Sequence, residues 1–423
     1  MTNETVLVVD DEDRIRSSLR GILSDEGFRV VDTGRAPDVM ELIEREHPDV
    51  VLLDVWMPDI DGIELLRRIK SERPAVAVIM ISGHANIQSA VAATKLGAAD
   101  FIQKPFSVTG LLASIARVLD GGHVGRVASI ADANRANGAS SVATLLDGAR
   151  PQRTIARSIV FGGQGLHTGL RTGVILHPAP VGHGIVFASL SDETQIAVQI
   201  ENVTDTGYNT TLASGARSVR TVEHLMSALH GFGITNLLIK TDDEVPALDG
   251  SALEFCRQIE EAGVKDQDAT LQPIRIKTPI TVRSKRDEFM TIEPADHLIV
   301  DYTLDYPAPI GVQTVHFELT STDAYVNEIA PARTFGFVRD FAQMNQMGLA
   351  MGGRLDNAII VDDQKIVNTK LRLPEEFARH KVLDLMGDLY LLGRPIEGRI
   401  TASKTGHSDN LAMVKAIRAA QAN

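Results

Sequence analysis

The chain has 423 residues, which is too long for one ordinary domain and predicts two or three. Asp and Glu number 55 against 42 Lys and Arg, and the resulting formal charge of -13 disfavours a nucleic acid as the main partner. Its single cysteine, Cys256, excludes an intrachain disulfide and favours a reducing compartment, which we take to be the cytoplasm.

Residues 1–120 alternate short apolar segments with amphipathic ones. Strands are expected at 6–9, 29–31, 50–53, 76–81 and 100–102, and apolar residues with helical spacing, such as Ile15, Leu19 and Leu23, lie between them. Strands that alternate with helices form a parallel sheet that is covered on both faces. We therefore predict a doubly wound α/β domain with a five-stranded parallel sheet.

Polar residues follow these strands at their carboxyl ends, the edge where open α/β sheets bind ligands. Asp10 and Asp11 follow the first strand, Asp54 ends the third, Ser82 ends the fourth and Lys104 follows the fifth. Three neighbouring carboxylates require a cation, and Mg2+ prefers such oxygen ligands. Asp54 could then attack a phosphoryl donor to form an aspartyl phosphate, whose oxygens Ser82 and Lys104 would bind.

The pieces VLVVDDE, LLDVWMPDIDG, ISGHA and FIQKPF carry these residues, and the region resembles a response-regulator receiver domain. The resemblance makes Asp54 the phosphoacceptor and Ser82 and Phe101 the switch pair. It places Lys104 with these two among the switch residues. It assigns Mg2+ to Asp10, Asp11 and Asp54. It also implies a cognate histidine kinase or another phosphoryl donor as partner. A receiver that serves only as a dimerisation surface, giving a homodimer, stays open as the alternative.

Residues 121–151 change in composition to Gly, Ala, Ser, Asn and Asp without an aromatic residue, which predicts a linker with a short helix near 142–146. Part of this segment could dock on a neighbouring domain. No helix-turn-helix pattern follows the first domain, so control of DNA is disfavoured. The chain contains no apolar run of about 18 residues and no signal-peptide pattern, so we expect no membrane span.

Residues 152–423 arrange their strands and helices in blocks, which is typical of an α+β fold. Helices are expected at 218–229 with a stop at Gly231, from 250 toward Gly263, and at 374–392. Strands are expected at 274–282, 298–306 and 399–404. We divide the region into halves at 152–271 and 272–423, each with a sheet packed on helices.

A metal site is indicated on the predicted helix at 374–392. His380 and Asp384 are four residues apart and share a helix face, and Asp388 lies one turn further. His224 is the leading third ligand, and Glu223 beside it could take a proton from a water on the metal. Two imidazoles and one carboxylate leave a fourth position for water, as in catalytic zinc sites, where zinc lowers the pKa of that water to about 7.

A further histidine, His407 in KTGHSDN, could stabilise an oxyanion or protonate a leaving amine when Asp388 keeps it protonated. The region also contains GQGLHTG, TVEHLMSALHGFGITN, ALDGSA, ARTFGFVRD and RHKVLDLMGDLYLLG. With these motifs, residues 153–420 resemble the UDP-3-O-acyl-N-acetylglucosamine deacetylases, zinc enzymes of lipid A biosynthesis.

The resemblance implies a role for each matching position. The zinc ligands would be His224, His380 and Asp384. Glu223 would be the general base and His407 the general acid or electrostatic partner, oriented by Asp388. Thr334 would polarise the amide carbonyl, and Lys381 would act beside the zinc. Phe335, Phe337 and Lys404 would lie on the sugar-nucleotide side of the substrate.

The two resemblances together imply a fused enzyme that hydrolyses the acetamide of UDP-3-O-acyl-N-acetylglucosamine and is modulated by phosphorylation at Asp54. Two alternatives stay open. The deacetylase-like region could be an inactive output of a signalling or scaffold protein, or it could act on a different acylated sugar. Transient contact with a membrane surface is also open.

Overall fold

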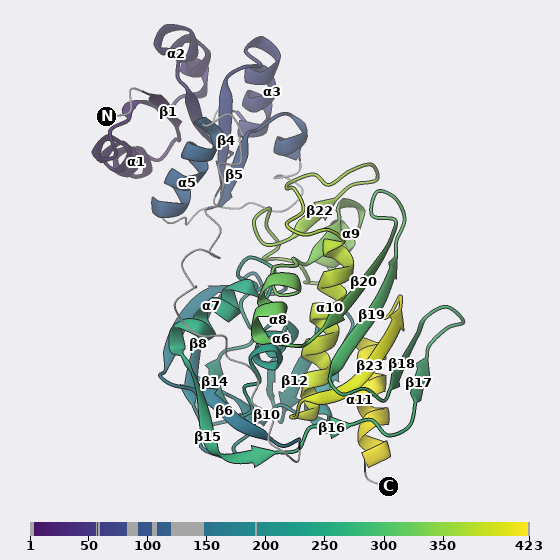
Figure 1. The fold of residues 1–423 in the computed structure, drawn as a ribbon. Helices are drawn as coiled ribbons and strands as arrows, with labels where there is room; N and C mark the ends of the chain where they lie inside the picture. Colours follow the sequence, from purple (N-terminus) through teal and green to yellow (C-terminus); the bar gives the residue numbers. More distant parts are fainter. Residues whose placement is uncertain are drawn as a thin grey trace. The chain divides into compact units, whose positions relative to one another are not determined.

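The computed structural model describes residues 4–55, 57, 60–82, 92–103, 108–119, 148–190 and 193–421. The chain forms two compact units, whose described parts lie within residues 4–119 and 148–421 (Figure 1). The short helix expected at 142–146 lies outside the described residues. Among the described residues, no helix combines the length and the apolar character that a bilayer crossing needs.

The N-terminal unit contains the predicted five-stranded parallel sheet, with strand order β2-β1-β3-β4-β5. Its strands are β1 (Thr5–Val9), β2 (Arg29–Thr33), β3 (Val50–Asp54), β4 (Ala77–Ser82) and β5 (Asp100–Gln103). Its described helices are α1 (Asp13–Asp25), α2 (Val39–Glu46), α3 (Gly62–Glu72) and α5 (Val108–Leu119), with a short 3-10 turn η1 (Ala36–Asp38). The doubly wound prediction for this region is confirmed.

Two apolar clusters cover the two faces of this sheet, because each of its central strands is buried on both sides. One face packs against residues of α2 and α3, such as Val39 and Leu66, and the other against α1 and α5, through Leu19 and Leu111. The carboxyl ends of the strands are thereby left for polar residues.

The first half of the C-terminal unit holds a five-stranded sheet of order β10-β9-β14-β8-β7. Its strands are β7 (Ile159–Gln164), β8 (Arg171–Pro178), β9 (Ile185–Ala188), β10 (Gln195–Ala197) and β14 (Leu237–Thr241). Smaller pieces are β6 (Arg150–Ile155) paired with β15 (Val264–Leu271), the sheet β11 (Val203–Asp205), β12 (Thr211–Ser214) and β13 (Arg217–Val219), and η3 (Ile200–Asn202). The helices are α6 (Glu223–Phe232) and α7 (Leu253–Ala262).

The second half holds a six-stranded sheet of order β17-β18-β23-β19-β20, with β16 added beside β23. Its strands are β16 (Ile274–Arg275), β17 (Ile280–Arg283), β18 (Phe289–Glu293), β19 (Leu298–Asp305), β20 (Val312–Glu318) and β23 (Ile396–Ser403). The helices are α8 (Thr322–Glu328), α9 (Val338–Gln346), α10 (Glu376–Leu389) with η4 (Tyr390–Leu392), and α11 (His407–Gln421). Strands β21 (Phe335–Phe337) and β22 (Ile359–Val361) pair separately.

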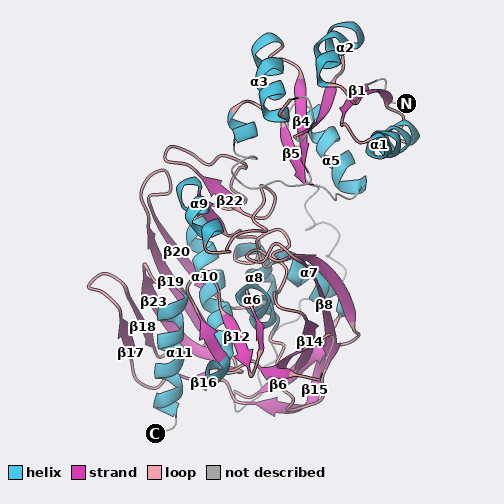
Figure 2. Cartoon of the chain, turned by 180° about the vertical axis from the view of Figure 1, so that it is seen from behind, coloured by secondary structure: helices cyan, strands magenta, loops and turns pink. Residues whose placement is uncertain are grey.

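Helices α6 and α10 join the two halves. Both views show them side by side, and α10 also packs on β19 and β20 (Figures 1 and 2). One continuous apolar cluster contains Leu225 and Leu229 of α6, Leu383 of α10, and residues of both sheets. The helices approach closely because Gly387 has no side chain, since a Cβ there would lie 2.0 Å from the carbonyl oxygen of Glu223. The α+β prediction with helices packed on sheets is confirmed.

The helix expected at 218–229 is α6, which spans Glu223–Phe232 and so begins and ends later than expected. Ser218 and Val219 belong to β13, because that strand pairs with β12 in a hairpin closed at Gly215. Gly231 does not stop the helix but lies inside it, where a Cβ would lie 2.2 Å from the Tyr325 ring. The stop is Gly233, which adopts a left-handed φ of 65°.

Two further boundaries differ from expectation. Strand β6 begins at Arg150, inside the segment expected to be linker, because it pairs with β15 more than a hundred residues away in the chain. Helix α11 was not predicted. Its apolar residues Leu411, Val414 and Ile417 are buried, so the helix closes the second half.

We expect Gly387→Ala to lower the free energy of unfolding of the C-terminal unit by about 1–3 kcal/mol or more, because the methyl group must push two helix backbones apart. Urea denaturation monitored by circular dichroism measures this. Gly173→Ala, where a Cβ meets nothing within 4 Å, is the control and should cost less than about 0.5 kcal/mol. Equal losses in the two variants would contradict the close crossing.

Candidate functional site

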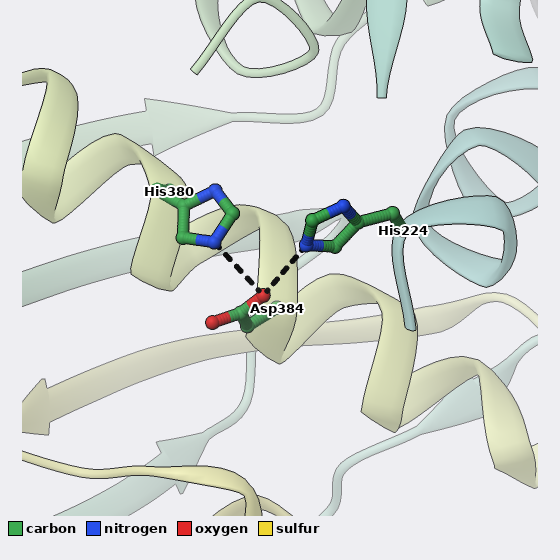
Figure 3. A group of neighbouring side chains, drawn as sticks. All are labelled: His224, His380 and Asp384. Atoms are coloured by element: carbon green, nitrogen blue, oxygen red, sulfur yellow. Dashed lines mark ion pairs between the residues drawn. The ribbon is translucent and has the colours of Figure 1, made fainter. Parts of the chain in front are cut away.

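Three buried side chains, His224, His380 and Asp384, gather where α6 meets α10 (Figure 3). His224 lies in the first turn of α6, and the other two lie one turn apart on α10. Oδ1 of Asp384 is 3.6 Å from Nε2 of His224 and 3.5 Å from Nε2 of His380. The two rings are nearly perpendicular, with centroids 5.0 Å apart. The structure thus brings together the three residues predicted as metal ligands.

This donor set fits a divalent cation. His380 donates from Nδ1 to the carbonyl oxygen of Ala332 at 3.1 Å, which leaves the lone pair of Nε2 directed toward Asp384. Burial lowers the pKa of His380 to about 3, so its ring is neutral, as a ligand must be. Burial alone would raise the pKa of Asp384, but His380, Lys381 and His224 hold it well below its usual range. Two imidazoles and one carboxylate could hold an ion such as zinc.

Lys381 lies beside this cluster. Its Nζ donates to Oδ2 of Asp384 at 3.0 Å and stands 5.8 Å from the centroid of the Phe335 ring. Burial opposes its charge, but Asp384 raises the pKa of Lys381 above its usual range. The lysine therefore stays protonated and occupies the carboxylate oxygen that faces away from the histidines.

Glu223, the residue before His224, is buried in the first turn of α6. Oε2 accepts a hydrogen bond from the backbone N–H of Thr210 at 3.0 Å. Burial raises the pKa of Glu223, although the neighbouring His407 and His224 oppose this shift. A carboxylate with a raised pKa is a better proton acceptor near neutral pH than an exposed one.

Asp388, one turn beyond Asp384 on α10, pairs with His407 and not with the three metal candidates. Its Oδ2 lies 2.7 Å from Nδ1 of His407 and accepts from Asn410 at 2.8 Å, while its Oδ1 accepts from Thr210 Oγ1 at 2.6 Å. Burial alone would lower the pKa of His407, but Asp388, Asp384 and Glu223 together raise it to about 9. The imidazole is therefore a cation at neutral pH.

The residues predicted for the substrate side are spread over a wider area. The backbone of Thr334 is held from both sides, because its N–H donates to Gly250 and its carbonyl accepts from Ile359. Phe335 has its ring centroid 6.2 Å from that of His380, so it lies beside the metal candidates. Two predicted residues have other neighbours: Phe337 contacts Tyr306 and Arg339, and Lys404 pairs with Asp287 and Asp305.

A second carboxylate cluster lies in the N-terminal unit. Oxygen atoms of Asp10, Asp11 and Asp54 lie within 4.8 Å of one another at the carboxyl ends of β1 and β3, with Asp10 and Asp54 buried. Helix α3 starts against the backbone of Asp54, where a Cβ on Gly62 would lie 2.1 Å from the Asp54 carbonyl oxygen. This oxygen-only donor set fits Mg2+.

Of the predicted switch residues, Ser82 is buried at the end of β4, and Phe101 is partly buried on β5 against the core. Strands β4 and β5 are paired, with Met80 opposite Phe101. Lys104 lies outside the described residues. The order of β1, β3 and β4 in the sheet therefore brings the predicted acidic residues and Ser82 to one edge.

Sequence reasoning missed three partners of the C-terminal site. Thr210 bridges Glu223 and Asp388, Asn410 supports Asp388, and the Ala332 carbonyl orients His380. Thr210 stands 178 residues before Asp388, so no local spacing connects them. A signal for Asn410 did exist, because it lies one helical turn after His407 at the start of α11.

Comparisons with known proteins divide the chain in the same way. The family model described as UDP-3-O-acyl N-acetylglycosamine deacetylase matches residues 152–419, and that of the response regulator receiver domain matches residues 6–116. The UDP-3-O-acyl-N-acetylglucosamine deacetylases of Myxococcus xanthus and Helicobacter pylori (strain J99) are 44% and 40% identical to this chain. Each alignment covers 63% of this chain, and 86% and 91% of the two relatives.

Among solved structures, the receiver domain of NtrX from Brucella abortus is 44% identical over 27% of this chain and 98% of its own, with a TM-score of 0.27.

We expect Asp388→Asn to lower the pKa of His407 from about 9 toward its ordinary value of 6.5, because the variant removes the main charge that opposes burial. Because folding raises this pKa, the stability that the pair contributes is fully present below the unfolded pKa and is lost as the pH rises through about 9. NMR titration of the His407 ring measures the shift.

Asp301→Asn is the matched control, because Asp301 pairs with a different histidine, His316, on the second sheet. It should lower the pKa of His316 and leave that of His407 unchanged. An unchanged titration of His407 in Asp388→Asn would show that Asp388 does not hold its proton.

Proposed function

The chain belongs to the UDP-3-O-acyl N-acetylglycosamine deacetylase family and carries a receiver domain over residues 6–116, and we propose that it hydrolyses the acetamide of UDP-3-O-acyl-N-acetylglucosamine to the free amine and acetate in lipid A biosynthesis. The named activity of its relatives supports this substrate. The observation that carries the proposal is the buried cluster of His224, His380 and Asp384, with Glu223 and the Asp388–His407 pair around it. We place the reaction in the cytoplasm.

We propose zinc as the ion that His224, His380 and Asp384 hold. When bound there, zinc would act as a Lewis acid that polarises an amide carbonyl and supplies hydroxide near neutral pH. Lys381 keeps Oδ2 of Asp384 engaged, which leaves Oδ1, the atom nearest both imidazoles, for the ion.

Glu223 is proposed as the general base. It is buried next to His224. Its Oε2 accepts a hydrogen bond from the backbone N–H of Thr210. Its raised pKa brings its proton affinity closer to that needed to take a proton from the attacking water.

His407 is proposed as the cation that stabilises the developing oxyanion and then protonates the leaving amine. Its Nδ1 faces Asp388, so its Nε2 remains for the substrate. A pKa of about 9 keeps the ring charged over the physiological range, and activity should fall as the pH rises above that value. Thr334 would bind the carbonyl oxygen, while Phe335, Phe337 and Lys404 would contact the rest of the substrate.

For the N-terminal unit we propose Mg2+ at Asp10, Asp11 and Asp54 and phosphorylation of Asp54 by a histidine kinase or another donor. Ser82, Phe101 and Lys104 would respond to the added charge. We propose that this modulates the deacetylase. The proposed domains are 1–120 for the receiver, 121–151 for the linker, whose last two residues already belong to β6, and 152–271 and 272–423 for the two halves of the enzyme.

Removal of the metal should abolish acetate release from UDP-3-O-acyl-N-acetylglucosamine, and added zinc should restore it. Replacing a residue that only supports a metal ligand typically lowers activity by roughly 10- to 100-fold. His224→Ala removes a proposed ligand itself, so it should lower turnover by more than that. His177→Ala, which alters a partly buried histidine on β8 bonded to Ser158, is the control and should keep full activity.

Equal turnover in His224→Ala and the wild type would refute the proposed site. Stoichiometric zinc binding without turnover on this substrate would instead favour an inactive output domain or a different acylated sugar, and turnover of other acylated sugars would separate these two.

Asp54→Asn should prevent incorporation of phosphate from acetyl phosphate, because the nucleophilic carboxylate is gone. The wild-type chain should show a change in turnover or oligomeric state on phosphorylation that the variant lacks. Asp25→Asn, which alters an exposed carboxylate at the end of α1, should behave as the wild type. No response of turnover, stability or oligomeric state in the phosphorylated wild type would exclude regulation through this site.

A further inference from the structure

The segment from Ala332 to Thr334 is attached to α10 at two points. The Ala332 carbonyl accepts from Nδ1 of His380 at 3.1 Å, and the backbone N–H of Arg333 donates to Oε1 of Glu376 at 3.1 Å. Glu376 and His380 are four residues apart and share a face of α10. The backbone that orients the His380 ring is therefore fixed one helical turn earlier by Glu376.

Glu376 is completely buried and its carboxylate is saturated with donors. Arg333 donates from its backbone N–H, from Nε at 2.8 Å and from Nη2 at 3.2 Å, and the backbone N–H of Arg372 donates at 2.5 Å. The same guanidinium reaches Thr369 Oγ1 at 2.9 Å and the Lys370 carbonyl at 2.8 Å. Each charge in this pair is thus compensated within the fold.

Stability alone does not account for a buried pair of this kind. Taking both charges out of water costs about as much as their attraction returns, and apolar residues of similar volume often serve as well. What an ion pair adds is a defined geometry, because a guanidinium fork fits a carboxylate in few orientations. Here that geometry sets the position of Arg333, whose backbone N–H directly follows the Ala332 carbonyl.

The orientation of the His380 ring depends on that carbonyl. An imidazole that donates from Nδ1 presents a lone pair at Nε2, and loss of the acceptor would free the ring to rotate or to change tautomer. His380 is buried away from water, so few other groups could accept the hydrogen bond from its Nδ1 in place of the Ala332 carbonyl.

We propose that the Arg333–Glu376 pair is a positioning device for the metal site: it holds the Ala332 carbonyl against Nδ1 of His380, so that Nε2 is presented to the ion. The inference rests on the proposed function, since it assumes that His380 binds zinc. Arg333 and Glu376 are positioning residues that act through Ala332 and do not touch the ion.

The test compares Glu376→Gln with Glu397→Gln in the full chain. Glu397 is a matched control, because it is also a nearly buried carboxylate with two arginine partners, Arg150 and Arg275, but it lies on β23 and holds none of the metal candidates. Zinc affinity is measured by competition with a chromogenic chelator, and unfolding is measured by urea. Both variants should lose stability, but only Glu376→Gln should weaken zinc binding, by roughly 10- to 100-fold.

Where Glu376→Gln does not fold, Arg333→Lys gives the same information, because lysine keeps the charge but lacks the fork that reaches Glu376, Thr369 and Lys370 together. It should weaken zinc binding in the same direction. In the metal-free chain, nitrogen-15 NMR of the His380 ring supplies a readout that does not depend on zinc or on turnover. The wild type should show a proton on Nδ1, and the variants should show a mixture of tautomers.

Variants that are less stable but bind zinc as tightly as the wild type, with an unchanged His380 tautomer, would overturn the positioning role and leave the proposed function intact. A wild-type chain that binds no zinc would overturn the proposed function and this inference together. A wild-type chain that binds zinc without hydrolysing the substrate would overturn only the proposed reaction.

Discussion

The close crossing of α6 and α10 is the constraint on which the candidate site depends. His224 comes from the first half of the C-terminal unit, and His380 and Asp384 come from the second, so the three atoms meet only if the two helices keep a fixed separation. That separation is set by backbone contact at Gly387 and Glu223, with no side chain in between. The apolar cluster that surrounds the crossing extends into both sheets. The fold of each half therefore determines the geometry of the site.

Buried polar groups at this crossing are tolerated because each has a partner on another element. Asp388 receives donors from Thr210, His407 and Asn410, and Asp384 faces two imidazoles and Lys381. Such a network is costly when incomplete and specifies one arrangement when complete. The pKa values of two histidines shift in opposite directions here: burial lowers that of His380 on α10, whereas Asp388, Asp384 and Glu223 raise that of His407 at the start of α11.

Local spacing predicted much of the site, and tertiary contacts explain the rest. The separation of His380 and Asp384 by one helical turn placed them on one face before any fold was known. The alternation of strands and helices also sufficed for the N-terminal sheet, because parallel pairing leaves few possible topologies. Thr210 and the Ala332 carbonyl could not be inferred, since they meet their partners across long stretches of chain. The prediction that α6 starts at residue 218 was wrong for a similar reason, because Val219 pairs with Leu212 of β12 and so belongs to a strand.

Helix α10 carries a row of four functional candidates at every fourth position: Glu376, His380, Asp384 and Asp388. Each step of four residues turns about 40° beyond a full revolution, so the row winds by about 120° over a length of about 18 Å. One helix thus contacts in turn the 332–334 segment, the remaining metal candidate His224, and His407. An insertion or deletion of one residue within it would rotate everything downstream by about 100°. A substitution in α10 therefore alters the contacts of one position, whereas a change in its length alters every contact beyond it.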